Sequence, residues 1–312
     1  MTQQPDKKDL KKNATLTPGD KEPDLKTDRE IEREEENRDF MPVILKWTDE
    51  SLRHPDDILE LAIAEGLEQL NRRFLSLFLS AIAAGLILGF SAMSVAVVET
   101  WMLSLDRDVF ARLATAFVYP LGFVLCIMSG TQLFTEHTAT AVYPVLDRQG
   151  TVGKLLRLWL IVLVGNLLGA IASAGFLVAA DGVIGAQEGY LAIGRHLVEF
   201  SAGSLFVSAI LAGWLMALGA WLVMATQPTL SQMASIYIVT FVIGIGGLHH
   251  SIAGSVEILT AYFIASEFSF RQVASFVLVA VAGNLVGGSI FVALLNYGHI
   301  RETQRMTSNG SE

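Results

Sequence analysis

Two stretches of the sequence decide the fold: Ser129-Gly130-Thr131-Gln132-Leu133-Phe134-Thr135-Glu136-His137 and Gly246-Gly247-Leu248-His249-His250-Ser251. Each places glycine and polar side chains inside a long apolar segment, at 110–146 and 232–264. Both segments exceed the roughly 20 residues with which a helix crosses a bilayer. Free backbone groups and ionisable side chains are tolerated at that depth only where protein buries them or they line a cavity. We therefore expect two broken membrane helices.

Apolar segments fill most of the remaining chain. Of its 312 residues, 52% are hydrophobic and 17% are charged, and residues 1–73 alone hold 13 of the 22 Lys and Arg and 19 of the 31 Asp and Glu. A remainder so poor in charge is typical of an integral membrane protein and excludes an ordinary soluble enzyme. We expect an all-α membrane domain with six transmembrane helices, at 74–101, 110–146, 154–180, 197–225, 232–264 and 272–298.

The charge pattern divides the chain into four parts. Residues 1–45 are polar and acidic, which predicts a disordered cytoplasmic tail. Residues 46–73 are expected to hold an amphipathic lead-in helix, because apolar residues recur at three- and four-residue spacing after Pro55. The six-helix channel domain is expected at 74–300, and a second cytoplasmic tail at 301–312.

A short motif occurs twice. Gly165-Asn166-Leu167-Leu168-Gly169 returns as Gly283-Asn284-Leu285-Val286-Gly287, which is an offset of 118 residues. The same offset carries Gln132 onto His250, so each Asn lies at an equal distance from its break. Two copies of three crossings must run in opposite directions through the membrane, which predicts a 3+3 inverted repeat with its site between the breaks. Small-residue packing in ordinary helices is the alternative interpretation of the motif.

Charge distribution also indicates orientation and excludes some partners. With the amino terminus inside, seven basic residues near the spans fall on the inner side and four on the outer side, which predicts that both termini are cytoplasmic. The net charge of −9 argues against nucleic-acid binding. Cys126 is the single cysteine, and the sequence has no zinc-site spacing, so we expect neither a metal nor a cofactor. The expected surroundings are membrane lipid.

The break motifs and the repeated Gly-Asn-Leu motif resemble the formate/nitrite transporter family, and in particular its divergent bacterial inner-membrane members. The resemblance runs from about Ile58 to Tyr297. It implies an aquaporin-like inverted repeat, a homopentamer with one pore in each protomer, and a small monovalent weak-acid anion as cargo. It also implies a central pore histidine at His250 and a pore loop at Leu133, Phe134 and Thr135.

The sequence departs from the family pattern at several positions. Gln132 stands where the family commonly has an acidic residue, His249 where it has Glu, and Gly254 where it has Asn. No Lys follows Lys154, so the lysine that formate and nitrite channels place near the outer vestibule is missing. Attraction of anions must therefore come from another group or be weaker.

His250 is the main candidate site residue. Its break lies at membrane depth, and an imidazole can meet an anion with a hydrogen bond or a proton near neutral pH. Transient protonation removes the desolvation barrier that a bare anion meets at an apolar constriction. Neighbouring residues on a helix point about 100° apart, so His249 and His250 cannot both face one narrow pore. We assign His249 a supporting role.

Four further residues complete the candidate set. Leu133, Phe134 and Ile243 are expected to form apolar walls of the pore, with plain core packing as the alternative. Glu136 is expected either to face His137 or His249 across the break or to act as a helix-start carboxylate.

Two other functions remain open from the sequence. The same hourglass fold conducts uncharged solutes in aquaporins, so a channel for a small uncharged solute is the alternative function. A membrane metalloenzyme would need further metal ligands beside His249 and His250, and only His137 and Glu136 on the opposite break offer any. No His-Glu-x-x-His motif is present. We therefore expect a channel and not an enzyme.

Overall fold

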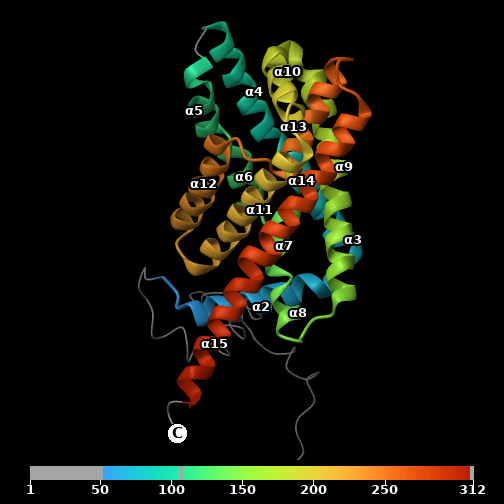
Figure 1. Ribbon diagram of the computed structural model, residues 1–312. Helices are drawn as coiled ribbons and strands as arrows, with labels where there is room; N and C mark the ends of the chain where they lie inside the picture. The colour runs from blue at the N-terminus through green and yellow to red at the C-terminus, as the bar shows by residue number, and fades with distance from the viewer. Residues whose placement is uncertain (1–51, 106–107, 310–312) are drawn as a thin grey trace, which may run out of the picture. The chain divides into compact units, whose positions relative to one another are not determined.

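The computed structural model describes residues 52–105 and 108–309, and every regular element within these ranges is a helix (Figure 1). The tail expected at 1–45 and the start of the lead-in region at 46–51 lie outside the described residues. The elements are α2 Pro55–Asn71, α3 Phe74–Ile87, α4 Gly89–Ser104, α5 Asp108–Val118, α6 Pro120–Met128, α7 Phe134–Thr140, α8 Tyr143–Leu146, α9 Val152–Ile184, α10 Gln187–Val198, α11 Ala202–Ala225, α12 Thr229–Gly246, α13 Ser251–Ile264, α14 Phe270–Val286, the π-helix η2 Gly287–Leu294 and α15 Leu295–Asn309.

Six stretches of helix in the described part of the chain are long and apolar enough to cross a membrane, which confirms the predicted fold class. Their hydrophobic side chains remain exposed on the outside of the bundle, as expected where lipid and not water is the surrounding medium. The stretches are Phe74–Ser104, Phe110–Met128, Val152–Ile184, Ala202–Ala225, Thr229–Gly246 and Phe270–Gln304.

Both expected breaks are present. The first separates α6 from α7 and the second separates α12 from α13. Gly130 and Gly247 end the first half-helices with φ of 68° and 59°, a left-handed conformation that favours glycine. The chain then runs extended through Leu133 and His250 before the second half-helices begin.

The second segment is more divided than the sequence predicts, and one connection contains a helix. Residues 110–146 form four helices and not two, because Pro120 starts a new helix at α6 and a turn at 141–142 separates α8 from α7. The stretch between the third and fourth spans, expected as a connection, forms the amphipathic helix α10. Its single apolar face is buried over Tyr190, Leu191 and Leu197, which is too short a pattern to indicate a membrane span.

The two Asn residues of the repeated motif hold the two breaks in the same way. Asn166 Oδ1 accepts the backbone N–H of Phe134 at 2.8 Å, and Asn284 Oδ1 accepts that of Ser251 at 2.7 Å. Each side-chain amide also donates to two carbonyls, of Ala81 and Gln132 for Asn166 and of Ala209 and His249 for Asn284.

This matched pairing corrects the register predicted for the repeat. Gln132 corresponds to His249 and not to His250, because these two carbonyls receive the equivalent hydrogen bonds. The sequence separation to the Asn is 34 residues in the first half and 35 in the second, so the second half holds one more residue between its break and its Asn. His250 therefore occupies the place of Leu133. The opposite direction of the two halves stays a prediction.

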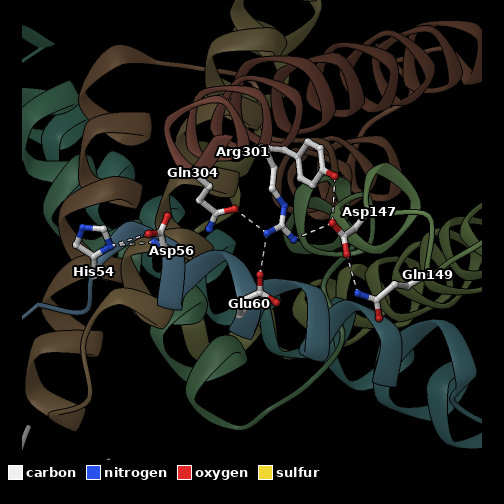
Figure 2. Close-up of polar contacts among 8 residues, drawn as sticks. His54, Asp56, Glu60, Asp147, Gln149, Arg301 and Gln304 are labelled. Carbon is white, nitrogen blue, oxygen red and sulfur yellow. Dashed lines mark hydrogen bonds and ion pairs between the residues drawn. The ribbon is translucent and has the colours of Figure 1, made fainter. Parts of the chain in front are cut away.

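The helix α2 packs against the end of the bundle that carries α8 and α15 (Figure 1). Its apolar stripe of Leu59, Ala62 and Ile63 is buried. Arg301 of α15 ties this region together, because its guanidinium binds Asp147 at 2.7 Å and Glu60 of α2 at 3.0 Å (Figure 2). The Tyr297 hydroxyl also donates to Asp147, at 3.0 Å.

Candidate functional site

Thr135 and His250 bring the two breaks together. The Oγ1 atom of Thr135, in the first turn of α7, lies 2.9 Å from the Nε2 atom of His250, the residue that caps α13. Both side chains are buried, and the edge of the Phe123 ring packs against the imidazole with 5.0 Å between ring centroids. The polar pair is thus enclosed by apolar groups, as a constriction requires.

The cap of α13 fixes the tautomer of His250. Its Nδ1 atom accepts the backbone N–H groups of Ile252 and Ala253, at 3.3 and 3.2 Å. A nitrogen that accepts hydrogen bonds carries no proton, so the ring hydrogen of the neutral imidazole is on Nε2. Nε2–H then donates to Thr135 Oγ1, and the threonine hydroxyl hydrogen remains available for a further acceptor.

His250 is one of the residues that line a cavity of about 310 Å³, which we name the polar cavity for the ionisable side chains in its wall. The wall comes from α4, α5, α10, α12 and α13 and includes Ile243. Its ionisable lining residues are Glu99, Arg112, Tyr119, His196, His249, His250 and Glu257.

Arg112 is the cation that sequence reasoning overlooked, because it counts there only as a charge near the end of a span. In the structure Arg112 is exposed in the cavity, and its guanidinium lies beside Gly247 of the second break. Within residues 52–105 and 108–309, no carboxylate forms an ion pair with it. The sequence offers no local signal for this position, because it results from the packing of α5 on α12.

Leu133 and Phe134 do not line the polar cavity, and both side chains are buried. The Leu133 backbone is extended and directly precedes α7. The two side chains pack in the protein core.

Gln132 belongs to a support network for the first break. The Nε2–H of His137 donates to its Oε1 atom at 2.6 Å, and the indole N–H of Trp159 donates to the His137 carbonyl at 2.9 Å. His137 therefore has its partners within its own half of the protein.

The expected pairing of Glu136 with His137 or His249 is wrong. In the part of the chain that the structure describes, His137 contacts Gln132 and Thr140, whereas His249 contacts Ser208. Glu136 lies half-buried in the first turn of α7, where a helix-start carboxylate, the alternative interpretation, would lie. Over the described ranges, no group of three His, Cys, Asp or Glu is arranged to hold a metal ion.

Comparisons with known proteins agree with this architecture. The sequence profile of the formate/nitrite transporter family matches residues 56–298. The inner membrane protein YfdC of Escherichia coli is 33% identical over 240 residues, which cover 76% of each chain. Among solved structures, an FNT family ion channel superimposes with a TM-score of 0.72 at 18% identity, covering 78% of this chain and 99% of the other. A pentameric formate channel with formate bound gives a TM-score of 0.60 at 20% identity, covering 72% and 96%.

Proposed function

Because the chain belongs to the formate/nitrite transporter family, we propose that it is a channel for a small monovalent weak-acid anion such as formate or nitrite, and that the anion is transiently protonated at His250. The observation that carries the proposal is the buried Thr135 and His250 pair, of which His250 lines the polar cavity. The hydroxyl hydrogen that Thr135 keeps free suits a single small acceptor. The family relationship supports transport in place of catalysis.

The first step of the mechanism is attraction of the anion into the cavity. Arg112 carries a permanent positive charge and lies beside the break that precedes His250. We propose that it supplies the attraction that a lysine would otherwise provide, since a cation in a cavity with low-dielectric walls raises the local anion concentration.

The second step is passage of the constriction. A bare anion loses its hydration there, whereas its neutral acid does not carry that cost. The Nε2–H of His250 donates to Thr135, and the threonine hydroxyl donates to the anion, which a proton then converts to the acid. A second proton on the ring would have to displace the backbone donors at Nδ1. We therefore expect His250 to act as a neutral donor through Thr135 while the proton arrives from cavity water.

The assembly and location follow from the relatives. The formate channel of similar fold is pentameric, and YfdC is an inner membrane protein. We propose a homopentamer with one pore in each protomer, in a bacterial inner membrane, with two inverted halves and both termini in the cytoplasm. Native mass spectrometry that finds only a monomer or dimer would contradict the pentamer.

Uptake into proteoliposomes tests the function. The full chain is reconstituted, and stopped-flow uptake of formate, nitrite, acetate and glycerol is compared with that of empty liposomes. The proposal expects uptake of at least one weak acid and none of glycerol. Uptake of glycerol alone would establish the channel for uncharged solutes.

A further inference from the structure

His249 is buried, yet one of its ring nitrogens has no partner. Its side chain is 4% exposed, and its ring packs edge-on against Phe200 and Phe276, at centroid distances of 5.3 and 6.0 Å. The Nε2 atom is inaccessible and makes no hydrogen bond with any described residue. A buried polar atom without a partner costs about 1–3 kcal/mol, so a ligand or a water that binds it stabilises the site.

The hydrogen bonds of Ser208 allow this free nitrogen to act as a donor. Ser208 Oγ accepts the backbone N–H of His249 at 3.3 Å and lies 2.8 Å from its Nδ1 atom. When the serine hydroxyl donates to Nδ1, the ring hydrogen is on Nε2. In this tautomer His249 offers a buried N–H that lacks an acceptor among the described residues.

Arg112 supplies a charge to the same place. Both residues line the polar cavity, and both also line a groove of about 660 Å³ that joins it along the first half of α11. The guanidinium lies beside Gly247, two residues before His249, and is exposed. A planar guanidinium presents two parallel N–H donors, which fit the two oxygens of a carboxylate or nitrite.

Other ionisable side chains also line the polar cavity, and two of them have interactions of their own. His196 is paired with Glu199 at 2.7 Å, and Glu99 has a partner of its own. Glu257 projects from α13 into the polar cavity and does not line the groove.

We propose that Arg112 and His249 form a second binding site for a small planar oxyanion, separate from the Thr135 and His250 pair. Its ligand class rests on the proposed function, whereas the site itself rests on the unpaired Nε2–H and the unpaired guanidinium. An anion held there waits next to the constriction, so the site sets the concentration at which transport saturates. The permanent charge of Arg112 excludes a metal cation from this position.

The test measures binding apart from transport. The full chain in detergent micelles is titrated with 13C-labelled formate, and NMR relaxation of the formate carbon reports the bound fraction. The variants are His249→Phe, which keeps an aromatic ring between Phe200 and Phe276, and Arg112→Gln. The matched controls are His299→Phe and Arg271→Gln, which replace an exposed histidine and an exposed arginine elsewhere.

We expect saturable binding in the wild-type chain and in both controls. Loss of one charge-assisted hydrogen bond should weaken it about ten-fold or more in each of the two site variants. His250→Asn should retain the binding, because that residue belongs to the other site. In proteoliposomes the site variants should raise the half-saturating concentration and preserve the maximal flux.

Three results would overturn the inference. They are absence of saturable formate binding to the wild-type chain, equal affinity in the Arg112→Gln variant, and loss of binding in His250→Asn alone. Arg112 is exposed, so its variant decides the outcome even if His249→Phe fails to fold. Wild-type formate uptake with unchanged saturation in the variants would remove this site and leave the proposed function intact.

Discussion

The hydroxyl oxygen of Thr135 lies 2.9 Å from Nε2 of His250, although 115 residues separate them in the chain. Each residue follows a break in a membrane helix, and each break is held by one buried Asn. The contact therefore depends on both halves of the protein, and these two residues form the centre of the proposed site.

Replacing the hydroxyl of Thr135 should impair transport more than stability. Thr135→Val has nearly the same shape but removes the donor that we assign to the anion. We expect weak-acid flux in proteoliposomes to fall about ten-fold, the effect of one lost hydrogen bond in the rate-limiting passage. Thr135→Ser retains the hydroxyl and is the matched control. Full flux in the valine variant would show that the hydroxyl does not contact the cargo.

The two Asn residues should be needed for stability. Asn166→Leu leaves the N–H of Phe134 and the carbonyls of Ala81 and Gln132 without their partner inside the protein. Each unpaired buried group costs about 1–3 kcal/mol, so we expect a clear fall in the thermal unfolding temperature of the purified protein.

Asn284→Leu should behave in the same way, because Asn284 makes the equivalent bonds in the second half. Asn71→Leu, at an exposed position, is the control. Unchanged unfolding temperatures in both buried variants would mean that the loops hold their shape without these bonds.

The cluster around Arg301 should make stability depend on acid. Burial alone would raise the pKa of Asp147, but hydrogen bonds from Gln149, Arg301 and Tyr297 outweigh it and lower this pKa below its ordinary 3.8. A carboxylate with a lowered pKa contributes stability above its ordinary pKa, and that contribution is lost as the pH falls through the folded-state value.

Asp147→Asn should therefore lower the unfolding temperature at neutral pH, and the difference from wild type should shrink below about pH 4. Thermal unfolding across this pH range measures it. A difference that is constant with pH would assign the loss to packing and not to charge.

Truncations separate the role of the amino-terminal tail from that of α2. A chain that starts at Met41 retains α2 with its buried stripe, so we expect it to assemble and conduct like the full chain. A chain that starts at Arg72 exposes the surface that Leu59 and Ile63 cover and should assemble poorly. Size-exclusion chromatography and uptake compare the two. Loss of flux in the chain that starts at Met41 alone would indicate that the tail regulates the pore.

The sequence predicts those features that are local. The two breaks are visible as Gly and His inside apolar segments, and His250 is identified by its place in one of them. Ile243 could be expected near His250, because it lies seven residues before it, in the half-helix that leads to the second break.

Features that depend on contacts between distant elements could not be predicted. Arg112 reaches the second break only because α5 packs on α12, and the partner of His249 comes from α11. The Gly-Asn-Leu motif places the two breaks one residue out of register, because the second half has one more residue between its break and its Asn, and the motif alone does not reveal it.

Formate uptake by the His250→Asn variant tests the central claim most directly. Asn is among the favoured residues at a helix N-cap, so this change preserves the start of α13 while it removes the imidazole. Stopped-flow uptake into proteoliposomes is measured over a range of external pH for the variant and the wild type. We expect wild-type flux to rise as the pH falls, and the variant to lose about ten-fold or more of it at each pH. Equal flux in the two proteins over this pH range would contradict the account, because His250 would then be a packing residue.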